Sequence, residues 1–257
     1  MAPTVAACQI DVADLDVAAN FTTVERRVRG LPESVAVAVF PEYALTGFVA
    51  DGRIDDVALA RDGTPVERLR RLAAAEDTAL LVGFVERKGD SLYNAAAYIE
   101  TDGATTVYRK RHLWDGERDV LEAGDELVIV ETPVGAAGVL TCYDLNFVGD
   151  SAALTDERVD ALFVLGAWPE TYSENWTLLL RARAIDGVRW VVGAGRTGRR
   201  ETGDDVIEYA GRSLVVRPDG GIRAALDRRP DDLVIDLDPE AVTVQREFVG
   251  IYDGPNV

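Results

Sequence analysis

Cys142 has the setting of a nucleophile, because it stands between an apolar run and a turn. Residues 136–140 predict a buried strand, and residues 143–147 look like a sharp turn into a helix. A strand end is rigid and a turn exposes the sulfur, while backbone N–H groups at the start of a helix can receive negative charge. Many free cysteines are instead small buried hydrophobes. This stretch alone therefore leaves both a catalytic role and a packing role open for Cys142.

Glu42 and Lys110 also stand where a strand is expected to end. Glu42 follows the apolar run 35–40 and Pro41, and a carboxylate at the mouth of a buried strand can act as a general base. Lys110 comes just past the run 105–109 and is one of only two lysines in the chain. A compact ammonium can stabilise an oxyanion with a geometry that a guanidinium cannot copy. The alternatives are a solvated loop acid at Glu42 and a basic surface turn around Lys110.

His112 is the only histidine, so a Cys–His dyad would need it as the base. It lies close to Lys110 and precedes Leu113 and Trp114, which suits a structural, hydrogen-bonded histidine, and we favour that interpretation. No G-x-S-x-G motif is present to support a serine triad. The second cysteine, Cys8, lies in an apolar run and is expected in the core. Because there is no CxxC pattern either, the sequence predicts no metal site and no disulfide framework.

Composition restricts the classes of partner. The 257 residues carry a formal net charge of −18, which argues against nucleic acid and anionic membranes because both require a cationic surface. A hydrophobic fraction of 47% indicates a folded protein, and no apolar run is long enough to span a bilayer. The chain enters a strand-like segment at once, without a basic leader, so we expect a cytoplasmic protein. The acidic, lysine-poor surface suits concentrated salt, although a GC-rich genome would also favour arginine.

Buried strands alternate with helices early in the chain, and hairpins are added later. Helices are predicted at 16–29, 66–75, 174–186 and 239–248. Strands are predicted at 4–10, 35–40, 79–85, 92–100, 105–109, 136–140, 161–165, 190–195, 213–217, 222–226 and 233–237. This pattern is typical of an α/β protein with mixed sheets and helices outside. Because no linker or repeat is found, residues 1–257 are expected to form a single domain.

Three motifs in this order resemble the nitrilase superfamily of carbon–nitrogen hydrolases. They are Phe40-Pro41-Glu42, Tyr108-Arg109-Lys110-x-His112-Leu113 and Thr141-Cys142-Tyr143-Asp144-Leu145. Further similar segments are Ala44-Leu45-Thr46-Gly47-Phe48, Tyr93-Asn94-Ala95-Ala96, Arg181-Ala182-Arg183-Ala184-Ile185-Asp186, and Gly211-x-Ser213 with Pro218-Asp219-Gly220. The resemblance covers nearly the whole chain, and the order of the set is more specific than any one motif.

The resemblance implies a Glu–Lys–Cys triad of Glu42, Lys110 and Cys142, with no metal or organic cofactor. It also implies a second acid near the site, for which Glu117 is the candidate and Glu122 the alternative. The implied fold is a four-layer α-β-β-α sandwich, usually paired as a homodimer or higher homo-oligomer. The implied reaction is hydrolysis of a small amide through a thioester on the cysteine.

The substrate is less determined than the reaction. The backbone N–H of Tyr143 would help to hold an oxyanion, and Ala167 and Trp168 would line the pocket. Arg181 and Arg196 could recognise a substrate carboxylate or could form structural salt bridges.

The chain also departs from the family in two places. Val148-Gly149 replaces the usual Pro-Glu, and Gly193-Ala194-Gly195 stands where an asparagine is usual, which puts the substrate class in doubt. Members that hydrolyse nitriles usually place Trp-Glu after the nucleophile, whereas this chain has Tyr143-Asp144. The resemblance therefore favours an amide over a nitrile. Nitrile hydrolysis, N-carbamoyl hydrolysis and a non-catalytic binding protein are the alternatives.

Overall fold

Two six-stranded mixed sheets form the centre of the molecule. The computed structural model describes residues 2–202 and 205–252. The first sheet has the strand order β14-β1-β2-β3-β4-β5, in which β1, β2 and β3 run parallel and the other neighbours are antiparallel. Its strands are β1 (Thr4–Gln9), β2 (Val35–Val39), β3 (Ala79–Lys88), β4 (Ser91–Ile99), β5 (Thr105–Arg109) and β14 (Asp231–Asp236).

The second sheet has the order β13-β12-β9-β8-β7-β6, in which β7, β8 and β9 run parallel. Its strands are β6 (Val128–Thr132), β7 (Gly135–Thr141), β8 (Ala161–Gly166), β9 (Trp190–Gly195), β12 (Leu214–Val216) and β13 (Ile222–Ala225). A separate hairpin pairs β10 (Arg199–Thr202) with β11 (Asp205–Glu208). β1 of the first sheet packs on β9 of the second, so both sheets are covered on their inner faces.

The period of two along each strand divides its side chains between two cores. In β1, Val5 and Ala7 belong to the core between the two sheets, whereas Ala6 and Cys8 belong to the core under the outer helices. Successive side chains of a strand point to opposite faces, so a strand that is buried on both faces is apolar throughout. This explains why β1 has no polar alternation, and it places Cys8 in the core as predicted.

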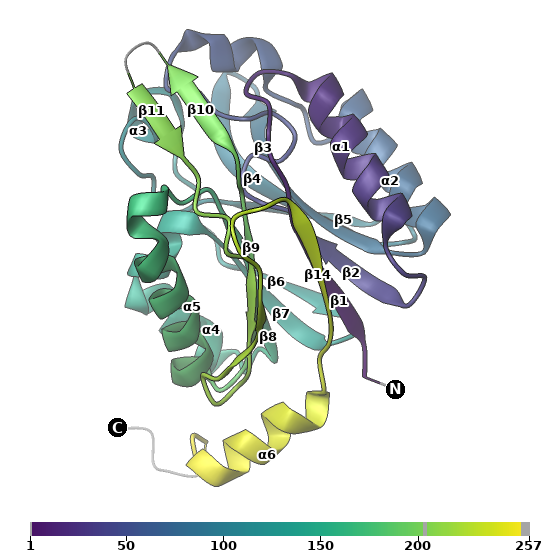
Figure 1. Cartoon of the computed structure of the whole chain (residues 1–257), viewed down its shortest axis with the longest axis vertical. Helices are drawn as coiled ribbons and strands as arrows, with labels where there is room; N and C mark the ends of the chain where they lie inside the picture. The colour runs from purple at the N-terminus through teal and green to yellow at the C-terminus, as the bar shows by residue number, and fades with distance from the viewer. Residues whose placement is uncertain (1, 203–204, 253–257) are drawn as a thin grey trace.

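Helices cover the outer faces of both sheets, as Figure 1 shows. α1 (Val17–Gly30) and α2 (Thr64–Glu76) lie on one side, and α4 (Val148–Asp156) and α5 (Ser173–Gly187) lie on the other. Shorter pieces are α3 (Glu117–Val120) and the 3₁₀ helices η1 (Gly52–Val57), η2 (Cys142–Asn146) and η3 (Glu170–Tyr172). α6 (Pro239–Val249) follows β14 at the bottom of the view. The predicted four-layer α-β-β-α sandwich is therefore confirmed.

The helix signals in the sequence act as expected. In α1, Asp16 accepts a hydrogen bond from the Ala19 N–H at 2.9 Å and caps the helix, while Phe21, Val24 and Val28 form its buried stripe. The proline in the first turn of α2 has no N–H, and it stands at a position where an N–H would have no acceptor within the helix. Within the described ranges, none of the helices combines the length and the hydrophobicity needed to cross a membrane.

The sequence analysis missed some short elements. It did not predict β6 or the hairpin of β10 and β11, whose strands are short, and β10 is rich in charge. The turn after Cys142 is a 3₁₀ helix, and α4 begins only at Val148, so the expected single helix is divided in two. The strands predicted at 213–217 and 222–226 are shorter in the structure.

Candidate active site

Cys142 lies where β7 ends and η2 begins. Its backbone has a φ of +50°, a left-handed conformation that non-glycine residues seldom adopt. The carboxylate of Asp144 accepts a hydrogen bond from the Thr141 N–H at 3.0 Å and so fixes the turn. The side chain of Cys142 is half-buried, and it lines two cavities together with Ala167. The turn therefore presents the thiol at the surface of a cavity while its backbone is held from behind.

Glu42 follows β2 at the carboxyl end of the first sheet. Its side chain is 2% exposed. Gly83 of β3 makes this position possible, because a Cβ there would lie only 2.5 Å from the Pro41 carbonyl oxygen and 2.9 Å from Glu42 Cα. The Leu45 N–H donates to the Gly83 carbonyl at 3.0 Å and holds the turn against the strand. A glycine in β3 thus lets the segment that carries Glu42 lie directly on the sheet.

Lys110 joins Glu42 to Glu117. Its Nζ lies 2.8 Å from Glu42 Oε1, 2.9 Å from Glu117 Oε1 and 2.8 Å from Glu117 Oε2. The three side chains are at most 5% exposed, and the two carboxylates lie far apart in the sequence, at positions 42 and 117. All three donors of the ammonium are therefore directed at carboxylate oxygens. Lys110 is a buried cation shared by two acids and not part of a basic surface turn.

Asn94, Tyr43 and Trp114 complete this polar cluster, and the sequence analysis assigned none of them a role. Asn94 Nδ2 donates to Glu42 Oε1 at 2.7 Å and to Glu117 Oε1 at 2.9 Å. The Tyr43 hydroxyl donates to Glu117 Oε1, and the Trp114 N–H donates to Glu117 Oε2 at 2.6 Å. Buried carboxylates need such donors, because an unpaired buried charge is costly.

The charges in the cluster influence one another's titration. Burial lowers the pKa of Lys110, but the carboxylates of Glu42 and Glu117 outweigh burial, so its pKa lies well above the usual value. Burial raises the pKa of Glu117, and Lys110 with its hydrogen bonds more than reverses this. Burial and the charge of Glu42 raise the pKa of the Cys142 thiol well above its usual value, against the opposing charge of Lys110. The resting cluster therefore pairs charged Lys110 and Glu117 with a protonated thiol.

Between the two candidates for the second acid, the structure brings Glu117 to the cluster and leaves Glu122 outside it. Glu122 accepts hydrogen bonds from Ser91 Oγ at 2.7 Å and from the Tyr93 hydroxyl at 3.1 Å, both in exposed surroundings. Glu117 begins the short helix α3 and is 4% exposed. Only Glu117 has the position that the resemblance requires.

Two adjoining cavities meet at Cys142. The inner cavity, of about 110 Å³, contains Glu42, Lys110 and Glu117 in its wall. The outer cavity, of about 230 Å³, is lined by residues that include Tyr143, Ala167 and Trp168. Ala167 borders both cavities, together with Trp114, Pro169 and Cys142. A small molecule whose reactive carbon lay beside the sulfur would therefore meet charged groups on one side and aromatic groups on the other.

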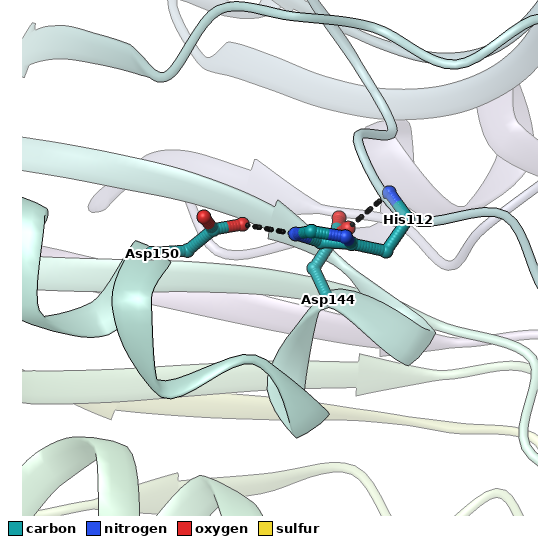
Figure 2. Close-up of side chains that lie close together, drawn as sticks. All are labelled: His112, Asp144 and Asp150. Carbon is teal, nitrogen blue, oxygen red and sulfur yellow. Dashed lines mark hydrogen bonds and ion pairs between the residues drawn. The ribbon is translucent and has the colours of Figure 1, made fainter.

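His112, Asp144 and Asp150 form a second cluster, in which Asp144 belongs to η2, the turn that carries Cys142 (Figure 2). His112 Nε2 lies 3.0 Å from Asp150 Oδ2, and the backbone N–H of His112 donates to Asp144 Oδ1 at 3.0 Å. The Tyr108 hydroxyl donates to Asp144 Oδ2 at 2.7 Å, and Arg111 pairs with the other oxygen of Asp150.

The same cluster decides between a structural and a catalytic histidine. Every carboxylate oxygen in it already faces a protein donor, so the arrangement fits a hydrogen-bond network better than a cation site. The His112 ring also stacks on Phe147, with the ring centroids 3.5 Å apart. This geometry favours the structural interpretation of His112, which ties the segment after β5 to the turn after β7.

Arg181 and Arg196, which the sequence offered as carboxylate binders, have structural partners. Arg196 Nη1 lies 3.0 Å from Asp14 Oδ1, and its Nη2 donates to the Val12 carbonyl at 2.8 Å. Arg181 Nε donates to the Gly220 carbonyl at 2.9 Å. Arg196 therefore forms the structural salt bridge that the sequence analysis offered as an alternative to substrate binding. Arg181 instead contacts a backbone carbonyl.

The two departures from the family pattern occupy different environments. Val148 is 64% exposed at the start of α4, away from the buried cluster. Residues 193–195 are buried in β9, where a Cβ on Gly193 would meet Leu180 of α5 at 2.6 Å and a Cβ on Gly195 would meet the Gly211 carbonyl at 2.1 Å. The glycines of β9 therefore serve close packing.

The comparisons with known proteins agree with the geometry. A family model described as carbon-nitrogen hydrolase matches residues 4–247. The chain is 33% identical to an omega-amidase, YafV, of Escherichia coli K12, over 83% of this chain and 80% of that one. It is 28% identical to an (R)-stereoselective amidase of a Pseudomonas species, over 93% and 86%. It superimposes on Saccharomyces cerevisiae Nit3, a member of branch 10 of the nitrilase superfamily, with a TM-score of 0.85, 26% identity and coverage of 97% and 94%.

Proposed function

Because the chain belongs to the carbon–nitrogen hydrolase family, we propose that it hydrolyses a small linear amide through a thioester on Cys142. The observation that carries this proposal is the shared cavity of Cys142, Glu42, Lys110 and Glu117. These are the nucleophile, base and cation that acyl transfer needs. The two amidases named above support an amide as the substrate.

The first half of the reaction begins from a protonated thiol. Because the pKa of Cys142 is raised, Glu42 takes the thiol proton as the sulfur attacks the amide carbon. The S–C bond forms, and the carbonyl electron pair moves to oxygen, where Lys110 Nζ and the backbone N–H of Tyr143 hold the oxyanion. The tetrahedral intermediate collapses when the C–N bond breaks. The nitrogen leaves as ammonia or an amine, with the proton that Glu42 carried.

The second half hydrolyses the thioester. Glu42 takes a proton from water, and the resulting hydroxide attacks the thioester carbon. The C–S bond breaks, the carboxylic acid leaves, and Glu42 returns its proton to the sulfur. Glu117 keeps Lys110 in place through two contacts, at 2.9 and 2.8 Å. Its Oε1 also accepts from Asn94, so the ammonium can exchange this contact for the oxyanion without leaving a carboxylate oxygen unpaired.

The wider proposal follows from the family and from the sequence. Residues 1–257 would act as one catalytic domain, in the cytoplasm, as a homodimer or higher homo-oligomer, on a small molecule and without a cofactor. Tyr143, Ala167 and Trp168 would contact the substrate from the outer cavity. An amide is favoured over a nitrile because its oxyanion meets Lys110 from the first step, whereas a nitrile first forms a thioimidate nitrogen.

The test is the capture of the acyl-enzyme. We expect intact-mass measurement with a slow amide to show an adduct on Cys142. Cys142→Ala should abolish ammonia release and leave the temperature of thermal unfolding unchanged. Cys8→Ala is the matched control and should keep activity, since Cys8 lies in the core. An adduct on Cys8 would falsify the assignment.

A matched amide and nitrile of one carbon skeleton decide the substrate class, and a higher kcat/KM for the nitrile would overturn the amide proposal.

A further inference from the structure

Two cations line the inner cavity, and among the described residues carboxylates of the protein pair with only one of them. Lys110 directs its donors at Glu42 and Glu117, at distances of 2.8 to 2.9 Å. The other cation is Arg200 of β10, which lines the same cavity as Cys142. The two cations of the cavity wall therefore differ, because the ammonium is paired with two carboxylates and the guanidinium is not paired with any described carboxylate.

Arg200 makes little use of its donors within the part of the chain that the structure describes. Its Nη1 donates to the Phe48 carbonyl at 2.8 Å. Its Nε is buried and has no hydrogen-bond partner there. A guanidinium presents five donors in a planar fork that fits a carboxylate with two parallel bonds. One contact to a neutral carbonyl anchors the side chain, and among the described residues Nε still lacks the acceptor that a carboxylate would supply.

The charges around the cavity make this cation necessary for an anionic substrate. Apart from Arg200, the cavity is lined by three acidic side chains, Glu42, Glu117 and Asp115, and by one basic side chain, Lys110. An anion that approached Cys142 past these groups would be repelled, since charges in a site of low dielectric interact strongly. Arg200 is the charge in the same wall that can offset this repulsion.

The charge of Arg200 also reaches the neighbouring wall of the cavity. Tyr209 follows β11, the partner strand of β10, and lines the same cavity. Burial raises the pKa of Tyr209, while the guanidinium groups of Arg196 and Arg200 act in the opposite direction. Arg196 is already paired with Asp14, which leaves Arg200 as the cation of this wall with ligand-binding capacity.

We infer that Arg200 binds a carboxylate of the substrate, so that the preferred substrates are monoamides of short dicarboxylic acids. The amide carbon lies beside Cys142, and the carboxylate at the other end of the acyl chain pairs with the guanidinium. The inference rests on the proposed amide hydrolysis. It differs from the carboxylate binders that the sequence suggested, because Arg181 and Arg196 have structural partners. The inner cavity of about 110 Å³ suits a short acyl chain.

The experiment compares one anionic amide with its neutral isostere. Succinamate carries a carboxylate where 4-oxopentanamide carries a methyl ketone, and the two are otherwise alike. We expect the wild-type kcat/KM for succinamate to exceed that for 4-oxopentanamide by about 10- to 100-fold, the range for a hydrogen-bonded charge. In Arg200→Met the ratio should fall to about one or below, mainly through the KM of succinamate. The ratio does not depend on how much of a variant is correctly folded.

Arg199→Met is the matched control, because it removes the same charge one residue away. Arg199 is exposed and pairs with Glu201 at 2.8 Å. This variant should keep the wild-type preference for succinamate, and Arg200→Lys should recover part of it, since lysine restores the charge without the fork.

The outcomes separate the two proposals. Equal hydrolysis of both amides by the wild type, or a ratio unchanged in Arg200→Met, would overturn the role of Arg200 and leave amide hydrolysis standing. A ratio lost equally in Arg199→Met would also overturn it, because any surface charge would then suffice. If the wild type hydrolysed neither amide and formed no adduct on Cys142, the proposed function would fail, and the inference with it.

Discussion

Lys110 allows two buried carboxylates to line the same cavity as the Cys142 thiol. Without a cation, Glu42 and Glu117 would repel each other, and one of them would take up a proton. The ammonium satisfies both, with contacts of 2.8 to 2.9 Å. Removing one partner of a buried ion pair costs about 3–5 kcal/mol because the other charge remains buried. At the scale of single residues, the charge cluster is therefore costly to break, and its proposed catalytic role depends on the same contacts.

Replacing Lys110 with arginine tests whether the position needs a compact charge. The cluster is closed around a single nitrogen, and a planar guanidinium cannot keep the same contacts. We expect Lys110→Arg to lower kcat by about 10²- to 10³-fold, the usual loss when an oxyanion donor is removed. Lys88→Arg, at the only other lysine, should keep full activity. If Lys110→Arg kept near wild-type turnover, the proposal that Lys110 stabilises the oxyanion would be contradicted.

The pH dependence of alkylation tests the state of the thiol. Because the pKa of Cys142 lies above its ordinary value of 9.0, the thiolate forms late, and alkylation by iodoacetamide should still accelerate beyond that pH. Glu42 raises this pKa and Lys110 lowers it. Glu42→Gln should therefore shift the profile to lower pH, and Lys110→Met should shift it to higher pH.

The alkylation rates are measured by mass spectrometry in a Cys8→Ala background, so that only Cys142 reacts. A rate that reached its plateau below about pH 8, under the ordinary pKa of a thiol, would show that the resting cysteine is a thiolate. The proton transfer assigned to Glu42 would then be unnecessary.

At the scale of elements, the position of Glu42 depends on β3. A Cβ at Gly83 would overlap the Pro41 carbonyl at 2.5 Å and the Tyr43 nitrogen at 2.7 Å, and these are backbone atoms that cannot turn aside. The segment that carries Glu42 would have to move off the sheet. Glu42 would then move away from Lys110. The two residues follow β2 and β5, which are three places apart in the first sheet, so their contact depends on how the Glu42 segment lies across the strands between them.

Gly83→Ala should therefore damage activity more than stability. We expect a loss of kcat of about 10²-fold, the effect of a displacement of about 1 Å at a reacting group, and a loss of about 1–3 kcal/mol in unfolding free energy from overpacking. Gly30→Ala is the control, because a Cβ there meets nothing within 4 Å. Chemical unfolding and ammonia release measure the two effects, and unchanged turnover by Gly83→Ala would contradict the close-approach argument.

At the scale of the whole molecule, surface charge dominates. A formal net charge of −18 produces repulsion that salt screens, since the Debye length falls from about 10 Å at 0.1 M to about 3 Å at 1 M. We expect Tm to rise steadily between about 0.1 and 1 M KCl. Sucrose is the control, because it stabilises by exclusion and does not screen charge. If Tm stayed flat or fell as KCl increased, the interpretation that the acidic composition reflects adaptation to salt would be wrong.

The outer helices suggest how copies of the chain associate. Leu178 and Ile185 are 65% and 54% exposed and lie seven residues apart on α5, so they share one face, and Val148 on the neighbouring α4 is 64% exposed. We expect light scattering to report a homodimer or a multiple of it, and Leu178→Glu to shift the mass toward one chain. Val206→Glu, at a 51% exposed position on β11, should leave the mass unchanged. A monomeric wild type would exclude this association.

The four-layer order came from the family resemblance, whereas the sequence alone predicted an α/β protein with buried strands and outer helices, and it placed Glu42, Lys110 and Cys142 at strand ends. These are local patterns, because an apolar run shows that a strand is buried and the residue after it shows what stands at the strand's mouth. The resemblance added Glu117, and the structure placed it 2.8 Å from Lys110.

Only the tertiary structure showed which strands lie side by side, and so which polar groups meet. Asn94 reaches Glu42 across 52 residues, and Tyr43 reaches Glu117 across 74, through contacts that no local pattern encodes. The same holds for Arg200, which stands in a short, charged hairpin that the sequence analysis missed. A local pattern reports how far a segment is buried but not which segment covers it. The cavity that Arg200 shares with Cys142 therefore became visible only in the tertiary structure.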